Sequence, residues 1–441
     1  MDQDRLISLD AFRGLTIAGM VLVNNPGTWA HIYDPLEHAA WHGITPTDFI
    51  FPFFLFIVGV AIPISLGKRV EEGVDRKVYW KIFSRSVIIF ALGLSISVIP
   101  FFQFQATDAP DWLKMLIWLV MTAALFFLLL RKFAIAAILA AISIAGIIGM
   151  CAAGYTVVPY DFETMRIPGV LQRIAVCYLI VAILFLHTDW RQQLGVAVAL
   201  LLGYWLLMTQ IAVPGCEVTT IDDKACNLAA YIDRTFLGEN HIWRAGKVFD
   251  PEGILSTLPA IATTISGVLT GLWLVRSPTV REGHVALTDV RATDTASGLF
   301  FFGVVLVAVG WIWNIYFPFN KSLWTSSYVV FTSGLALCTL GVCYWLIDIK
   351  GYRKWSKPFV IFGVNALALF VFSGIMARMI GAHRVAGLDD KPIALQKWVF
   401  DTIYSAIAQP VDASLLYALS FILFWLFLMW LLYRKGIFIR V

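Results

Sequence analysis

Charged residues are scarce in this chain of 441 residues: they make up 14% of it, whereas 59% of the residues are hydrophobic. Soluble globular domains carry about 25% charged residues, so a water-soluble protein of this composition would lack an adequate polar surface. The chain is therefore expected to lie in a lipid bilayer. Its net charge of only +4 argues against nucleic acid as a partner.

Sequence motifs of several common enzyme classes are also missing. We find no Walker loop, G-x-G-x-x-G, H-E-x-x-H or G-x-S-x-G motif. The six cysteines form no C-x-x-C pair and no zinc-ligand spacing, so no metal site is expected. Cys216 and Cys226 share one polar loop, and the sequence leaves open whether they form a disulfide. The first apolar segment ends in Asn24, Asn25 and Pro26 rather than in small residues, so we expect no cleaved signal peptide.

Long apolar runs, by contrast, are abundant. A membrane span needs about 20 mostly apolar residues to cross about 30 Å of hydrocarbon. Twelve segments meet this requirement, at roughly 7–26, 47–67, 79–101, 111–131, 133–155, 168–187, 190–213, 252–276, 296–317, 323–347, 358–380 and 413–434. The fourth and fifth meet at Arg131 and Lys132, which predicts a tight helical hairpin over about 111–155. The sequence thus predicts an all-α, polytopic transmembrane helical bundle, a single integral-membrane domain over residues 1–441.

Lysine and arginine are concentrated in one alternate set of the loops between these spans, and the opposite set is poorer in them although it contains the two longest loops, at about 214–251 and 381–412. Because basic loops stay in the cytoplasm, both termini are predicted to be cytoplasmic. Removing one hairpin removes two spans and leaves this assignment unchanged.

The first loop on the opposite side holds the densest group of proton-transfer residues in the chain: Glu37, His38, His42 and Asp48. Asn24 ends the preceding span. One interpretation is an aromatic belt with polar neighbours at the membrane surface. The other is a reactive site, since ionisable groups near membrane depth are costly and usually functional.

Other polar residues lie at or inside the predicted spans. Arg173 lies in the first turns of one span, and Asp250 with Glu252 stands at the start of another, where helix capping and function explain them equally well. Lys321 and Asn365 give weaker signals, and an interhelical hydrogen bond would explain Asn365.

Eight stretches of the chain resemble the heparan-α-glucosaminide N-acetyltransferase family of transmembrane acetyltransferases, including its shorter bacterial relatives. These stretches are RLISLDAFRG (5–14), VLVN ending at Asn24, HAAWHGITPTDFIFPFFLF (38–56), RIPGVLQR (166–173), FDPEGILSTL (249–258), NKSLWTSSYV (320–329), GVNAL around Asn365, and YRKGIF (433–438). They occur in order along nearly the whole chain. The resemblance implies ten shared spans, so the hairpin at 111–155 is interpreted as an addition.

The resemblance implies an enzyme that transfers an acetyl group from cytosolic acetyl-CoA to the amine of a glucosamine-type sugar or oligosaccharide on the far side of the membrane. A bacterial inner membrane, with the active site open to the periplasm, is the expected location. The family's essential histidine corresponds to His38, its asparagine to Asn24, and its phosphate-facing arginines to Arg5 and Arg13. We add Arg85 to this donor side. The residues assigned to the acceptor are Arg173, Asp250, Glu252, Lys321 and Asn365.

In the mechanism that these residues suggest, His38 is the general base that deprotonates the acceptor ammonium. Asp48 would fix the tautomer of His38, and Asn24 would donate to the developing oxyanion. An acetyl-histidine intermediate is an alternative route. Two other functions stay open: O-acetylation of a surface glycan, and a transporter or flippase for a sugar or lipid-linked sugar. The sequence also leaves open whether the protein is a homodimer.

Overall fold

The computed structural model describes residues 6–276, 290–387 and 391–439 of the chain. Contacts within the chain divide it into two compact units, each assembled from three separate stretches. The first unit comprises residues 1–17, 38–91 and 166–363, and the second comprises residues 18–37, 92–165 and 364–441. Helices α1 (Ile7–Asn24) and α3 (Arg76–Val98) each contribute residues to both units.

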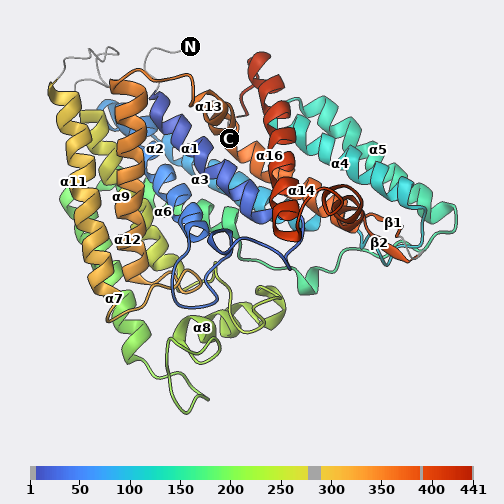
Figure 1. The fold of residues 1–441 in the computed structure, drawn as a ribbon, viewed down its shortest axis with the longest axis horizontal. Coiled ribbons are helices and arrows are strands. Elements are labelled where there is room, and N and C mark those ends of the chain that lie inside the picture. The colour runs from blue at the N-terminus through green and yellow to red at the C-terminus, as the bar shows by residue number, and fades with distance from the viewer. Residues whose placement is uncertain (1–5, 277–289, 388–390, 440–441) are drawn as a thin grey trace. The chain divides into compact units, whose positions relative to one another are not determined.

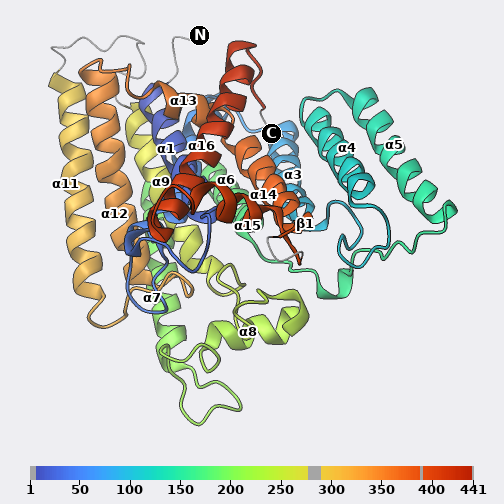
Figure 2. The ribbon, with the colours of Figure 1, turned by 45° about the vertical axis from the view of Figure 1, so that its right-hand side comes forward.

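The first unit is built mainly from apolar helices. Its elements beyond its parts of α1 and α3 are η2 (Pro46–Phe49), α2 (Ile50–Glu72), α6 (Val170–His187), α7 (Trp190–Gln210), α8 (Leu228–Leu237), η4 (Glu239–His241), α9 (Thr257–Arg276), α11 (Val290–Trp313), α12 (Ser326–Cys343), the π-helical η5 (Tyr344–Ile349) and α13 (Lys357–Val364). Helices α9, α11 and α12 lie side by side, as both ribbon views show (Figure 1, Figure 2).

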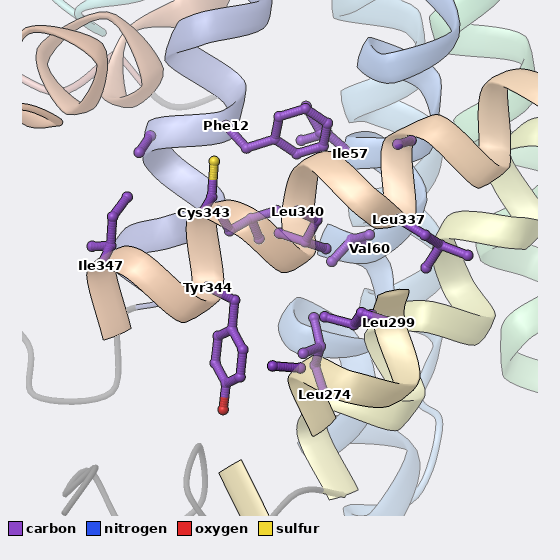
Figure 3. Packing of buried hydrophobic residues seen from close by; sticks show 14 of the residues in the cluster. Phe12, Ile57, Val60, Leu274, Leu299, Leu337, Leu340, Cys343, Tyr344 and Ile347 are labelled. Atoms are coloured by element: carbon purple, nitrogen blue, oxygen red, sulfur yellow. The ribbon is translucent and has the colours of Figure 1, made fainter. Parts of the chain in front are cut away.

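A buried apolar cluster joins the helices of the first unit. Phe12 of α1, Ile57 of α2 and Leu340 of α12 converge there and are fully or almost fully buried (Figure 3). Helices α2 and α9 approach closely, and a side chain at Gly59 would lie 2.0 Å from the carbonyl oxygen of Thr264. Only a residue without Cβ fits there, which is how small residues let membrane helices pack at short range.

The second unit contains the predicted hairpin. Helices α4 (Asp111–Leu129) and α5 (Phe133–Ala152) run antiparallel and meet in a tight turn at Arg131, whose φ of 58° lies in the left-handed region (Figure 1). The other elements, beyond its parts of α1 and α3, are η1 (Asp34–Leu36), η3 (Phe162–Thr164), α14 (Ala366–Ala382), β1 (Arg384–Ala386), β2 (Pro392–Ala394), α15 (Leu395–Val399), the π-helical η6 (Phe400–Tyr404) and α16 (Pro410–Arg434). Strands β1 and β2 pair antiparallel, with Val385 opposite Ile393.

The all-α, polytopic fold is confirmed. Within the described residues, 11 helices are long and apolar enough to cross a membrane, and α13 with α14 makes up to 12 if this pair, broken at Asn365, is one span. Some helix bounds differ from the prediction: α11 begins at Val290 rather than at residue 296, and the span expected to start at residue 252 starts as a helix only at Thr257. The preceding residues form a turn instead, for a reason that the site makes clear.

Candidate functional site

His38 and Asp48 form a hydrogen-bonded pair in the first unit. Asp48, 1% exposed, lies in η2 at the entrance to α2, and its Oδ1 is 2.7 Å from Nδ1 of His38. Its Oδ2 accepts the backbone N–H groups of Thr45 at 3.0 Å and Ala39 at 3.2 Å, so the loop closes around this carboxylate. An ionised carboxylate only accepts hydrogen bonds, so a neutral imidazole at His38 would carry its proton on Nδ1 and keep its lone pair on Nε2.

Lys321 lies against the same histidine. It belongs to the connection between α11 and α12, and its Nζ is 3.0 Å from Nδ1 and 3.1 Å from Nε2 of His38. Its distance to Oδ1 of Asp48 is 3.7 Å. Burial lowers the pKa of Lys321 below its ordinary value, although the carboxylates of Asp48 and Glu252 act in the opposite direction. The amino group of Lys321 thus lies beside the imidazole ring of His38, within hydrogen-bond distance of Nε2.

A second histidine of this loop is also paired with an aspartate. Nε2 of His42 is 2.8 Å from Oδ1 of Asp222, and Nδ2 of Asn320 is 3.4 Å from Nδ1 of His42. The neighbouring residues Asn320 and Lys321 thus contact one histidine each. The side chain of His38 is 45% exposed and that of His42 27%, so the more accessible imidazole is the one that holds the buried carboxylate.

The turn before α9 carries a second group of charges. Arg166 donates to both oxygens of Asp250, from Nε at 2.8 Å and from Nη2 at 2.6 Å, and its Nη2 also contacts Glu252. The buried Asp233 of α8 accepts the backbone N–H of Ile254 at 2.8 Å and that of Asp250 at 3.3 Å. These bonds hold the backbone in a turn, which explains why the helix begins later than predicted.

Arg173 of α6 lies behind this turn with unused donors. It is 2% exposed, and its Nη2 donates to the carbonyl oxygen of Gly253 at 3.1 Å and to the hydroxyl of Ser256. Its Nε and Nη1 have no hydrogen-bond partner among the described residues. Buried donors of a guanidinium normally find acceptors, so Arg173 has the capacity to bind further acceptor oxygens. The guanidinium also lies 5.1 Å from the ring of Trp324.

The charged turn before α9 and the group around His38 interact electrostatically, because the Glu252 carboxylate is one of the charges that act on Lys321. Six of the residues expected from the sequence therefore lie in the first unit, and they are His38, Asp48, Lys321, Arg173, Asp250 and Glu252. No role was predicted for Arg166, Asp233, Asn320 or Asp222. Arg166 and Asn320 did carry a signal, because Arg166 belongs to the stretch that leads to Arg173 and Asn320 directly precedes Lys321.

The remaining predicted residues lie elsewhere. In the first unit, Nη1 of Arg13 is 3.1 Å from Oδ1 of Asp10. The guanidinium of Arg85 lies 5.0 Å from the ring of Tyr178, and its buried Nε has no hydrogen-bond partner within the described part of the chain. Arg5 falls outside the described residues.

Asn24 and Asn365 belong to the second unit. Asn24 is exposed at the end of α1. Asn365 is fully buried, donates to the carbonyl oxygen of Ile437 at 3.1 Å and accepts the N–H of Ile439 at 2.8 Å. Its amide thus fixes the C-terminal segment.

Cys216 and Cys226 are joined by a disulfide, which settles the alternative that the sequence left open. The loop that they close contains Asp222, the partner of His42. No group of three or more His, Cys, Asp or Glu residues suited to a metal ion occurs in the part of the chain that the structure describes.

Comparison with known proteins confirms the family resemblance. Residues 5–164 match the model of the heparan-α-glucosaminide N-acetyltransferase catalytic family. The chain is 27% identical over 413 residues to the mouse heparan-α-glucosaminide N-acetyltransferase, covering 83% of this chain and 53% of that protein. It is 28% identical over 416 residues to the human protein of the same name, covering 83% and 52%. The chain thus spans about half the length of the curated relatives that it matches.

Proposed function

We propose that this protein is a membrane acetyltransferase that transfers the acetyl group of acetyl-CoA to the amine of a glucosamine-type sugar. The observation that carries the proposal is the His38–Asp48 pair, in which the buried carboxylate holds Nδ1 and leaves Nε2 able to accept a proton. The names of the mouse and human relatives support acetyl transfer to glucosamine as the reaction.

The acceptor ammonium must lose two protons, one before its nitrogen attacks and one as the amide forms. Nε2 of His38 takes a proton from the acceptor ammonium, and the free amine attacks the thioester carbonyl carbon. The carbon–sulfur bond then breaks and the CoA thiolate leaves. The nitrogen, now bonded to the acetyl group, loses its second proton to the thiolate, which gives the amide and the free CoA thiol, and His38 releases the first proton to water. Lys321, at 3.0–3.1 Å from the ring nitrogens of His38, is placed to stabilise the negative charge that develops in this step.

The acceptor is assigned to the turn before α9. Hydroxyl groups of a sugar can supply the acceptor atoms that Nε and Nη1 of Arg173 lack. Glu252, with 10% of its side chain exposed, is a carboxylate within the electrostatic reach of Lys321 and is suited to attract an ammonium. Arg166 holds this turn through its bidentate pair with Asp250.

The donor is assigned to the basic side of the bundle. Arg13 and Arg85 belong to the half of the topology that the lysine and arginine distribution places in the cytoplasm, where acetyl-CoA would be available. The disulfide between Cys216 and Cys226 supports an oxidising compartment for the opposite side. We infer a bacterial inner membrane with the His38 loop facing the periplasm. Both termini lie in the cytoplasm if α13 and α14 together cross the membrane once.

The test uses purified protein in liposomes with acetyl-CoA and a choice of acceptors. Glucosamine should release free CoA thiol, whereas glucose, which has a hydroxyl in place of the amine, should not. Thiol release with glucose would indicate O-acetylation instead. Flux of labelled sugar across the liposome membrane without thiol release would indicate a transporter and refute the proposal.

A further inference from the structure

The loop closed by the disulfide, residues 216–226, contacts residues 38–48, the histidine loop, through three of its residues. The carbonyl oxygen of Ile221 accepts the indole N–H of Trp41 at 2.9 Å, and Oδ1 of Asp222 lies 2.8 Å from Nε2 of His42. Nζ of Lys224 lies 5.6 Å from the centre of the Trp41 ring. Trp41 and His42 come three and four residues after His38, so these contacts restrain the segment that carries the proposed base.

Helix α8 follows the disulfide directly and contacts the other part of the site. Asp233 of α8 accepts the backbone N–H groups of Asp250 and Ile254 and thereby sets the path of the turn that carries Glu252. A side chain at Gly253 would lie 2.0 Å from a carboxylate oxygen of Asp233, so the turn and the helix are in close contact.

Hydrogen bonds tie the disulfide loop to α8. Oδ1 of Asn227 accepts the N–H of Ala230 in the first turn of α8 at 2.9 Å, while its Nδ2 donates to the carbonyl oxygen of Asp223 at 2.9 Å. Nη2 of Arg234 in α8 donates to the carbonyl oxygen of Ala225 at 2.9 Å. Residues 216–237 therefore form one cross-linked piece, which we call the clamp.

We propose that the clamp positions the acceptor site, with Asp222 holding the histidine loop and Asp233 holding the turn of Glu252. The inference rests on the proposed function, because it concerns the binding of the sugar amine. Attack on the thioester requires the base and the acceptor-binding groups to keep a fixed spacing. The disulfide restrains that spacing because it closes the loop that contains Asp222 and ends just before α8, which carries Asp233.

The kinetic test compares Asp222→Asn, Asp233→Asn and the double variant Cys216→Ser/Cys226→Ser with the wild type. We expect each to raise KM for glucosamine about fivefold or more, as the loss of one positioning hydrogen bond would, and to leave KM for acetyl-CoA unchanged. Glu217→Gln, an exposed carboxylate in the same loop, and Cys151→Ser, an exposed free cysteine, are the matched controls and should behave as wild type.

Hydrogen exchange gives a second measurement that needs no activity. Asp222→Asn should speed amide exchange in residues 38–48, Asp233→Asn in residues 250–256, and the cysteine double variant in both. Unchanged exchange in these segments, or an unchanged KM for glucosamine in all three variants, would overturn the clamp. Absence of acetyl transfer by the wild type would instead refute the proposed function, so the two failures are distinguishable.

Discussion

Replacing Asp48 with asparagine keeps the shape of this buried side chain but removes one of its two acceptor oxygens. Both oxygens are in use: Oδ1 faces Nδ1 of His38 at 2.7 Å, and Oδ2 accepts the N–H groups of Thr45 and Ala39. An asparagine would therefore turn its NH₂ group, which donates, toward groups that also donate: either His38 or the two backbone N–H groups. The effect of the substitution on catalysis depends on which of these the NH₂ group faces.

If the amide NH₂ faces the backbone, two N–H groups lose their acceptor, at about 1–3 kcal/mol for each buried group. If it faces His38, the imidazole can adapt by moving its proton from Nδ1 to Nε2. We expect this second arrangement because it leaves fewer groups unsatisfied. His38 then has no lone pair on Nε2 and cannot act as a base there. Loss of general-base catalysis lowers kcat by about 10²–10⁴-fold, or about 3–5 kcal/mol.

The assay is the release of CoA thiol at saturating acetyl-CoA and glucosamine, together with the midpoint of thermal unfolding. Asp189→Asn is the matched control, because Asp189 also accepts two backbone N–H groups, those of Arg191 and Gln192, but holds no histidine. The control should keep wild-type kcat. An Asp48→Asn protein that is folded and retains wild-type kcat would refute the tautomer argument.

Three further predictions concern stability. Arg166→Lys removes the two parallel hydrogen bonds to Asp250 and should lower the free energy of unfolding by about 1–3 kcal/mol. The measurement is the midpoint of thermal unfolding, which should decrease. An unchanged midpoint would show that the Arg166–Asp250 pair does not contribute to stability. Gly59→Ala should cost about 1–3 kcal/mol or more by separating α2 from α9, whereas Gly67→Ala in the same helix, with open space around it, should be tolerated. Burial, helped by the charge of Asp250, raises the pKa of Asp233 from 3.8 to about 6. The folded protein therefore binds this proton more tightly than the unfolded chain does. The free energy of unfolding should fall by at most about 3 kcal/mol as the pH rises from about 4 to about 6. In Asp233→Asn, unfolding measured over this pH range should show a smaller dependence on pH.

Local features of the chain were predictable from the sequence. The hairpin turn at Arg131 follows from two apolar runs that leave only two charged residues between them. The contact between His38 and Asp48 was also expected, since both residues lie in one short loop that enters a helix. The catalytic role of this pair stays a prediction.

Contacts between distant segments were not predictable in the same way. Lys321 is 283 residues from His38, and Arg166 is 84 residues from Asp250, so helix packing rather than any local pattern brings them together. Asp233 is a further example. It belongs to α8, which lies inside a stretch that was predicted only as a long loop. Its carboxylate holds the Asp250–Ile254 backbone, and the predicted helix start at residue 252 was displaced as a result.

The most direct test of the central claim is the formation of N-acetylglucosamine from acetyl-CoA and glucosamine by wild-type protein and by His38→Ala. The claim predicts that the wild type forms the product with an equal amount of free CoA thiol, and that His38→Ala loses this activity while it still unfolds in a cooperative thermal transition. Product formation by His38→Ala at the wild-type rate would contradict the assignment of this histidine as the base.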